Sequence, residues 1–168
     1  LDVGTGTGSL ALAIGARTTV KSVKGLDFSP AYVDYATHRN SDLRLSFEVG
    51  DATALRYADA SFDRVLSLLV LFFVSNPTQA ISEMKRVARP GATVAAATWD
   101  LRGGMQASRM FQDTAAMFDP RAAKMRAANL TRPLCHPGEL GAAWRDAGFR
   151  DVQETTLAIR MEFENFAD

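Results

Sequence analysis

The pattern of apolar and polar positions alternates between two periods from residue 1 to residue 99. Short apolar runs predict strands covered on both faces, whereas apolar residues spaced three or four apart predict helices. The predicted strands cover residues 1–3, 20–28, 43–49, 62–70 and 92–99, and the predicted helices cover 9–17, 30–40 and 77–88. Because parallel neighbouring strands need crossover connections, this alternation predicts an α/β fold, a mainly parallel sheet with helices on both faces.

The pattern changes after residue 100. Residues 104–129 predict one or two helices rich in Met and Ala, residues 137–147 predict another helix, and residues 151–161 predict a final strand. The first of these segments places five residues on one helical face: Ala107, Met110, Phe111, Thr114 and Phe118. Such a face predicts either core packing or a hydrophobic lid that adapts to a ligand. We expect one domain over residues 1–168, with an insertion at 100–136 that can cover an acceptor site.

Composition excludes several classes of protein. The 19 Lys and Arg balance the 19 Asp and Glu, so no overall field attracts nucleic acid or an anionic membrane. The longest apolar run, residues 65–74, is about half of a membrane span. The single cysteine, Cys135, excludes an internal disulfide and an all-thiolate zinc site. We expect a cytoplasmic protein with no membrane span and no metal.

Glycines occupy alternate positions in Asp2-Val3-Gly4-Thr5-Gly6-Thr7-Gly8, between the first strand and the first helix. Glycine lets the backbone turn tightly and approach a ligand, and the following helix N-terminus offers free N–H groups. The dinucleotide fingerprint fits only in its looser form, Gly6-x-Gly8-x-x-Ala11. The turn alone is therefore compatible with several nucleotide cofactors, NAD(P) among them, or with no ligand.

Acidic residues end the next two predicted strands. Asp27 comes about twenty residues after the glycines, where a carboxylate can accept hydrogen bonds from both hydroxyls of a ribose. Its other possible role is to cap the next helix, for which Ser29 is better placed. Asp51 ends the third strand and can accept from an exocyclic amine such as adenine N6, or it can form an Asx-turn.

Five ordered segments resemble the motifs of class I S-adenosylmethionine-dependent methyltransferases, most closely the branch of the ubiquinone and menaquinone biosynthesis C-methyltransferases. They are the glycine segment above, Leu26-Asp27-Phe28-Ser29-Pro30, Val49-Gly50-Asp51-Ala52, Ser61-Phe62-Asp63-Arg64-Val65 and Arg89-Pro90-Gly91. The resemblance covers about residues 1–100. It implies a Rossmann-like fold and an S-adenosyl-L-methionine cofactor, and it disfavours an NAD(P)-dependent oxidoreductase.

The resemblance also implies roles for particular residues. Asp2, Gly4, Gly6, Thr7 and Gly8 would surround the amino-acid part of the cofactor. Asp27 would hold the ribose with Phe28 beside the adenine, and Asp51 and Ala52 would flank the adenine ring. Ser67 would lie under the methionine portion, with Leu68 near the transferred methyl group.

The sequence defines the residues that would bind the methyl acceptor less closely than those that would bind the cofactor. Leu71-Phe72-Phe73 stands where many relatives have polar or His residues, and predicts either an apolar acceptor pocket or core. His136 and Asp100 are candidate acceptor or base residues, whereas His38 is expected to be solvated. The resemblance implies in-line methyl transfer to a small-molecule acceptor of apolar character. The protein then mainly aligns the reactants, and no residue need be catalytic. A non-catalytic cofactor-binding fragment is the further alternative.

The family usually has an N-terminal helix over the cofactor and a last antiparallel strand. We expect this chain to be a fragment that lacks both, because it opens at Leu1-Asp2-Val3, directly before the glycine turn, and ends at Phe166-Ala167-Asp168 with no segment suited to that last strand. The predicted strand at 151–161 would then lack its neighbour. We expect residues beyond about 150 to be loosely held or to pair in another way.

Overall fold

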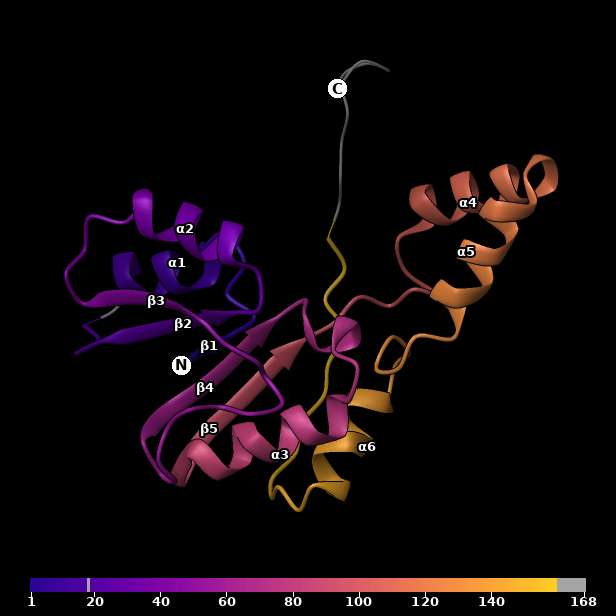
Figure 1. The fold of residues 1–168 in the computed structure, drawn as a ribbon. Helices are drawn as coiled ribbons and strands as arrows, with labels where there is room; N and C mark the ends of the chain where they lie inside the picture. The colour runs from indigo at the N-terminus through magenta and orange to yellow at the C-terminus, as the bar shows by residue number, and fades with distance from the viewer. Residues whose placement is uncertain (18, 160–168) are drawn as a thin grey trace.

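The computed structural model describes residues 1–17 and 19–159. Its centre is one five-stranded parallel sheet with the order β3-β2-β1-β4-β5 (Figure 1). The strands are β1 (Asp2–Val3), β2 (Val23–Asp27), β3 (Leu45–Val49), β4 (Phe62–Leu68) and β5 (Ala88–Ala97). The predicted α/β class is confirmed.

The short strand β1 occupies the centre of this sheet. Asp2 pairs with Gly25 of β2 on one side and with Leu66 of β4 on the other. The strand order reverses between β1 and β4, and in open parallel sheets ligands bind at the carboxyl ends of the strands beside such a reversal.

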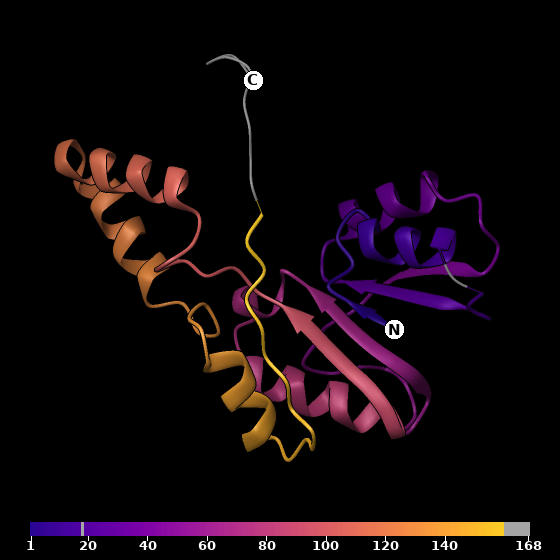
Figure 2. The same ribbon diagram turned by 180° about the vertical axis from the view of Figure 1, so that it is seen from behind.

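Helices cover both faces of the sheet. The helices α1 (Ser9–Arg17) and α2 (Pro30–His38) lie on one face, and α3 (Pro77–Val87) lies on the other (Figures 1 and 2). Local sequence explains where two of them begin. Ser29 caps α2 by accepting from the N–H of Tyr32, Asn76 caps α3 by accepting from the N–H of Gln79, and proline follows each cap.

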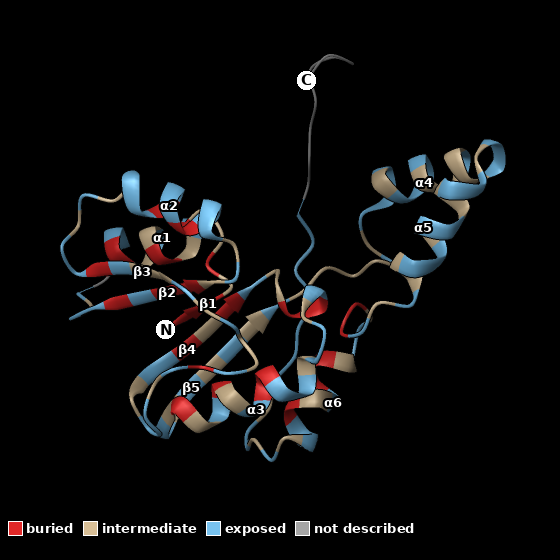
Figure 3. Ribbon diagram, viewed as in Figure 1, coloured by how far each residue is buried: buried red, intermediate tan, exposed pale blue. Residues whose placement is uncertain are grey.

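The core is divided between the two faces. The larger cluster joins the sheet to the apolar stripe of α3, whose residues Ala80, Ile81, Met84 and Val87 are fully buried. A smaller cluster joins α1 to β2 and β3 through Ala11, Val23 and Leu45. Figure 3 shows the buried positions concentrated on the sheet and on the helix faces turned toward it.

The boundary between the third helix, predicted over 77–88, and the next strand, predicted over 92–99, lies earlier than predicted, by one residue for the helix and by four for the strand. The helix α3 ends at Val87, and β5 begins at Ala88 and runs through the Pro-Gly pair, with Gly91 at a φ of +78°. The register between β4 and β5 shifts at this point, between Phe62 and Arg64. A bulge at the edge of a sheet accommodates a proline and a left-handed glycine that a regular ladder would exclude.

Beyond β5 the chain forms α4 (Gln106–Phe118), α5 (Pro120–Leu130) and α6 (Glu139–Asp146), and a short 3₁₀ turn, η1 (Leu71–Phe73), follows β4. The segment expected as one or two helices is therefore two. The five residues of its predicted apolar face are all exposed, so the core interpretation was wrong within the described part of the chain.

The predicted final strand at 151–161 was also wrong over its described part, because residues 151–159 form no strand. Its last two residues lie outside the described residues. Glu154 instead ties this segment to α6, where its Oε1 and Oε2 accept from the N–H groups of Gly138 and Gly141 at 2.7 and 2.8 Å. The described part of this segment is therefore held by side-chain bonds to the start of α6 and not by strand pairing.

Candidate cofactor site

The glycine turn between β1 and α1 is fastened to β2. Its three glycines, Gly4, Gly6 and Gly8, all have positive φ angles, and the N–H groups of Gly4 and Thr5 donate to the carbonyl of Leu26 at 2.7 and 2.9 Å. A Cβ on Gly4 would overlap the side chain of Val70. The loop after β4 thus lies so close to the glycine turn that position 4 has no room for a side chain.

Gly6 marks the open part of the turn, because a Cβ built there meets no atom within 4 Å. Its N–H donates to Oδ2 of Asp27 at 2.8 Å, and the N–H of Ser29 donates to Oδ1 of Asp27 at 2.9 Å. Two backbone donors therefore hold this half-buried carboxylate beside the open turn. Each oxygen keeps a further lone pair with which to accept from a ribose hydroxyl.

Two buried polar atoms lie where the ends of β1 and β4 meet. The Asp2 side chain is buried, and its Oδ2 accepts from the Thr5 hydroxyl at 2.7 Å, whereas Oδ1 has no partner among the described residues. Burial raises the pKa of Asp2 above its ordinary value. The Ser67 hydroxyl is likewise buried without a partner in that part of the chain. Since an unpaired buried polar group costs about 1–3 kcal/mol, a polar ligand that bonded these atoms would be stabilised here.

The predicted adenine side lies at the ends of β2 and β3, where Asp27 pairs with Val49. Oδ1 of Asp51 accepts from the N–H and from the hydroxyl of Thr53, each at 2.8 Å, and these bonds lower the pKa of Asp51. The Asx-turn interpretation is therefore realised, and Oδ2 accepts no hydrogen bond from the described residues. Phe28 is 81% exposed at the same edge and offers an apolar surface to a planar ring.

The loop after β4 contains features that the sequence does not signal. Leu69 has a φ of +60°, a strained conformation for a side chain of this size, and its N–H donates to the Ala97 carbonyl at 2.9 Å. The two phenylalanines differ in burial, and the core interpretation holds for Phe72 only. Phe72 is buried in the core, whereas Phe73 is exposed, with the guanidinium of Arg132 5.0 Å from its ring centroid.

A cavity of about 220 Å³ that is open to solvent has Ser67 among its lining residues. Its other lining residues are apolar: Leu10, Leu66, Leu68, Ala95, Ala96 and Ala97. The cavity thus lies along the ends of β4 and β5, beside the start of α1.

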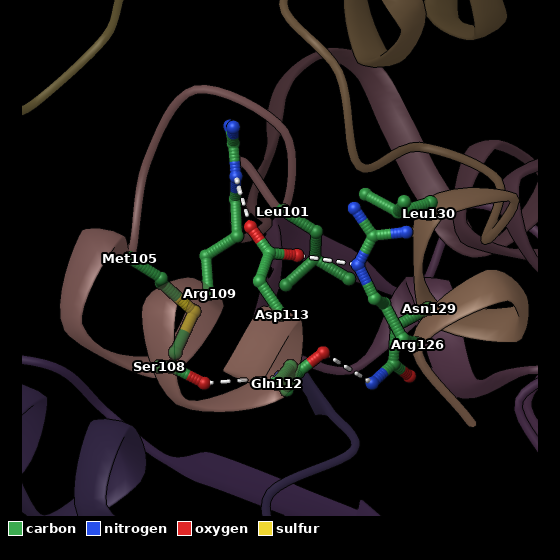
Figure 4. Close-up of a pocket in the computed structure, with 9 residues that line it drawn as sticks. All are labelled: Leu101, Met105, Ser108, Arg109, Gln112, Asp113, Arg126, Asn129 and Leu130. Carbon is green, nitrogen blue, oxygen red and sulfur yellow. Dashed lines mark hydrogen bonds and ion pairs between the residues drawn. The ribbon is translucent and has the colours of Figure 1, made fainter. Parts of the chain in front are cut away.

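A second cavity lies between α4 and α5 and holds about 20 Å³ (Figure 4). That volume suits no more than a single water molecule. Its polar lining residues bond mainly to one another, so it is not a cofactor site.

The remaining candidates have separate environments. Oδ1 of Asp100 accepts from the N–H groups of Arg102 and Gly103, which gives Asp100 a structural role in a turn. His136 is half-buried, and its Nδ1 has no partner among the described residues. His38 is exposed, as predicted.

Cys135 is buried, and burial raises the pKa of its thiol to about 11. Within residues 1–17 and 19–159, no group of three or more His, Cys, Asp or Glu is placed to hold a metal ion. None of the helices described there has the length and apolar character needed to cross a membrane.

Sequence reasoning placed the glycine turn and the acidic strand ends correctly in space, since all lie at the carboxyl ends of β1, β2 and β3. It missed Thr5 as the partner of Asp2, and it missed the contact of Val70 with Gly4. The Thr5–Asp2 bond had a usable signal, because a polar residue stands three positions after the acid. The Val70–Gly4 contact had no local signal, because it depends on the path of a loop 66 residues away in the chain.

Comparison with known proteins agrees with this geometry. A family profile described as a methyltransferase domain matches residues 1–96. The demethylmenaquinone methyltransferase of Deinococcus radiodurans is 41% identical over 93 residues, which cover 54% of this chain and 39% of that protein. The ajmaline N-methyltransferase of Rauvolfia serpentina is 36% identical over 98 residues, which cover 56% of this chain and 33% of that protein. The chain thus spans well under half the length of these relatives.

Solved structures share the fold. The [4+2]-cyclase SpnF matches with a TM-score of 0.66 and 26% identity, over 88% of this chain and 48% of that one. A SAM-dependent methyltransferase from Aquifex aeolicus matches with a TM-score of 0.66 and 22% identity, over 89% of this chain and 70% of that one.

The fold and the family match define a class I S-adenosylmethionine-dependent methyltransferase domain, as the sequence motifs predicted. The chain belongs to the methyltransferase domain family, and its named relatives include members of the menaquinone branch. The NAD(P)-dependent oxidoreductase alternative is not favoured by these matches.

Proposed function

We propose that the protein binds S-adenosyl-L-methionine and transfers its methyl group to a small-molecule acceptor of apolar character. The observation that carries this proposal is the Asp27 carboxylate, which two backbone N–H groups hold beside the open turn at Gly6. The unpaired atoms of Asp2 and Ser67 support it, because they suit the polar amino-acid end of this cofactor.

When bound, the cofactor supplies a sulfonium-activated methyl group as the electrophile. The chain's own residues bind and orient. Asp27 accepts from the ribose hydroxyls, Asp51 and Ala52 flank the adenine with Phe28 beside it, and Gly4, Gly6, Thr7 and Gly8 surround the amino-acid part. Leu68, which also lines the apolar cavity, keeps water away from the transfer point. Such alignment of two reactants can contribute about 7–11 kcal/mol to the lowering of the barrier.

The apolar lining of the 220 Å³ cavity supports an acceptor of apolar character. The named relatives act on acceptors as unlike as demethylmenaquinone and ajmaline, so the matched domain does not by itself select one. We further propose that the base of the 100–136 insertion borders the acceptor. The N–H of Leu101 joins the two ends of that insertion by donating to the Cys135 carbonyl at 3.1 Å, and Arg132 reaches Phe73. A cytoplasmic location fits the single buried cysteine, and no nucleic-acid partner is proposed.

Two measurements test the proposal. Isothermal titration should show that the protein binds S-adenosylhomocysteine and prefers it to NADH, and a preference for NADH would overturn the proposal. Methyl transfer should then be assayed with labelled S-adenosylmethionine on matched pairs of apolar and hydrophilic phenols and amines, with the apolar member of each pair preferred. Binding without turnover on any acceptor would favour the non-catalytic alternative.

A further inference from the structure

The helices α4 and α5 form a hairpin that projects away from the rest of the molecule (Figures 1 and 2). Among the described elements they pack chiefly on each other. Asp119 connects them, and its carboxylate caps α5 by accepting from the N–H of Arg121. The end of the hairpin around this residue is thus an isolated surface feature.

The contact between the two helices is polar (Figure 4). Asp113 of α4 forms an ion pair with Arg126 of α5, and Asn129 of α5 donates to the side chain of Gln112 at 3.3 Å. Since polar residues occupy the inner side, the apolar residues of α4 lie outside. Met110, Phe111, Met117 and Phe118 are 70%, 73%, 79% and 81% exposed.

The hairpin segment also concentrates positive charge. Residues 101–132 contain six Arg or Lys and two Asp, whereas the rest of the chain contains thirteen Arg or Lys and seventeen Asp or Glu. The chain is neutral overall because the hairpin segment has a net positive charge and the rest of the chain has a net negative charge. Arg121 and Lys124 lie in the first turns of α5, a few residues along the chain from the exposed pair Met117 and Phe118 at the end of α4, and Arg121 forms an ion pair with Asp119 at 2.9 Å.

We propose that the α4–α5 hairpin docks on an anionic lipid surface. Phe118 and Met117 enter the boundary between headgroups and acyl chains, and Lys124 contacts the anionic headgroups. Interfacial binding combines exposed aromatic and apolar side chains with nearby cations, and here α4 supplies the former and α5 the latter. A second copy of the chain fits less well, because a symmetric contact would place one basic hairpin against another.

Sedimentation with lipid vesicles tests this docking in the intact chain. Vesicles of phosphatidylcholine with about one third phosphatidylglycerol should bind the protein, vesicles of phosphatidylcholine alone should bind it much more weakly, and high salt should release it. Phe118→Ser should weaken binding about tenfold, since it removes one buried aromatic side chain. Lys124→Gln should weaken it about fivefold, as expected for one cation at an anionic surface.

Matched controls lie far from the hairpin. Leu43→Ser removes a fully exposed apolar side chain from the loop before β3, and Lys21→Gln removes an exposed cation before β2, so both should bind like the parent. All four substitutions are at exposed positions, and thermal unfolding should confirm intact folds. Binding of S-adenosylhomocysteine should not change, which separates this proposal from the proposed function.

Two outcomes would overturn the docking proposal: no binding to anionic vesicles, and losses of binding in the control variants equal to those in Phe118→Ser and Lys124→Gln. If vesicle binding is absent and the protein forms dimers that dissociate on Phe118→Ser, the exposed face belongs to a second copy instead.

Discussion

Replacing Asp27 by Asn separates the two roles of this residue, holding the glycine turn and binding the ribose. The carboxylate accepts from the N–H groups of Gly6 and Ser29 at 2.8 and 2.9 Å. An amide of the same shape keeps one accepting oxygen and turns a donor toward the other N–H. One charge-assisted hydrogen bond is lost, and the remaining bond becomes a neutral one.

The expected losses of stability and of cofactor affinity follow from these hydrogen bonds. Hydrogen bonds to charged groups contribute about 1.5–3 kcal/mol and neutral ones about 0.5–1.5 kcal/mol. Because Asp27 is half-buried, we expect the low end, a loss of about 1–2 kcal/mol in the free energy of unfolding. For a domain of this size that corresponds to a Tm lowered by roughly 3–6 °C. The loss of a charge-assisted bond to the ribose should weaken cofactor binding about 10- to 100-fold.

The assay combines calorimetric unfolding with isothermal titration of S-adenosylhomocysteine. Asp34→Asn is the matched control, since Asp34 is exposed on α2 and should change neither value. A Tm that falls while the dissociation constant stays unchanged would refute the ribose assignment and leave Asp27 with the role of fastening the turn. Asp27→Ala should weaken cofactor binding by at least tenfold on the same reasoning.

Three further predictions test other parts of the structure. Gly4→Ala adds a Cβ that overlaps Val70 at a positive φ, and should cost about 2–4 kcal/mol in urea unfolding; Gly6→Ala, at a similar φ in open space, should cost less than half as much. The guanidinium of Arg86 lowers the pKa of Glu83 below its ordinary value of 4.5, so the stability from this pair is present above that pH and is lost as the pH falls through the folded-state pKa. Glu83→Gln should therefore cost about 1–2 kcal/mol at pH 7, with a smaller difference at pH 3.5, and an equal cost at both values would contradict the pairing. In hydrogen exchange, the amides of residues 155–159 should exchange rapidly, and strong protection there in a monomer would mean that the segment pairs as a strand after all.

The sequence by itself determined the alternating elements and the position of the proposed site. The starts of α2 and α3 are specified locally, by the capping hydrogen bonds of Ser29 and Asn76 and by the prolines that follow them, Pro30 and Pro77. The acidic strand ends come together because parallel strands deliver their carboxyl ends to one edge of the sheet. These features depend on local geometry and on one topological rule, so the order of residues along the chain is sufficient to predict them.

Only the tertiary structure decided which of the apolar residues are covered. Phe72 and Phe73 are adjacent in the chain, yet one lies in the core and the other on the surface beside Arg132. The apolar face of α4 is exposed because Asp113 and Arg126 turn the polar sides of the hairpin toward each other. The left-handed backbone of Leu69 depends on contacts with distant segments. A hydrophobic pattern shows which face of an element avoids water, but the surface that covers it is chosen by contacts between residues far apart in the chain.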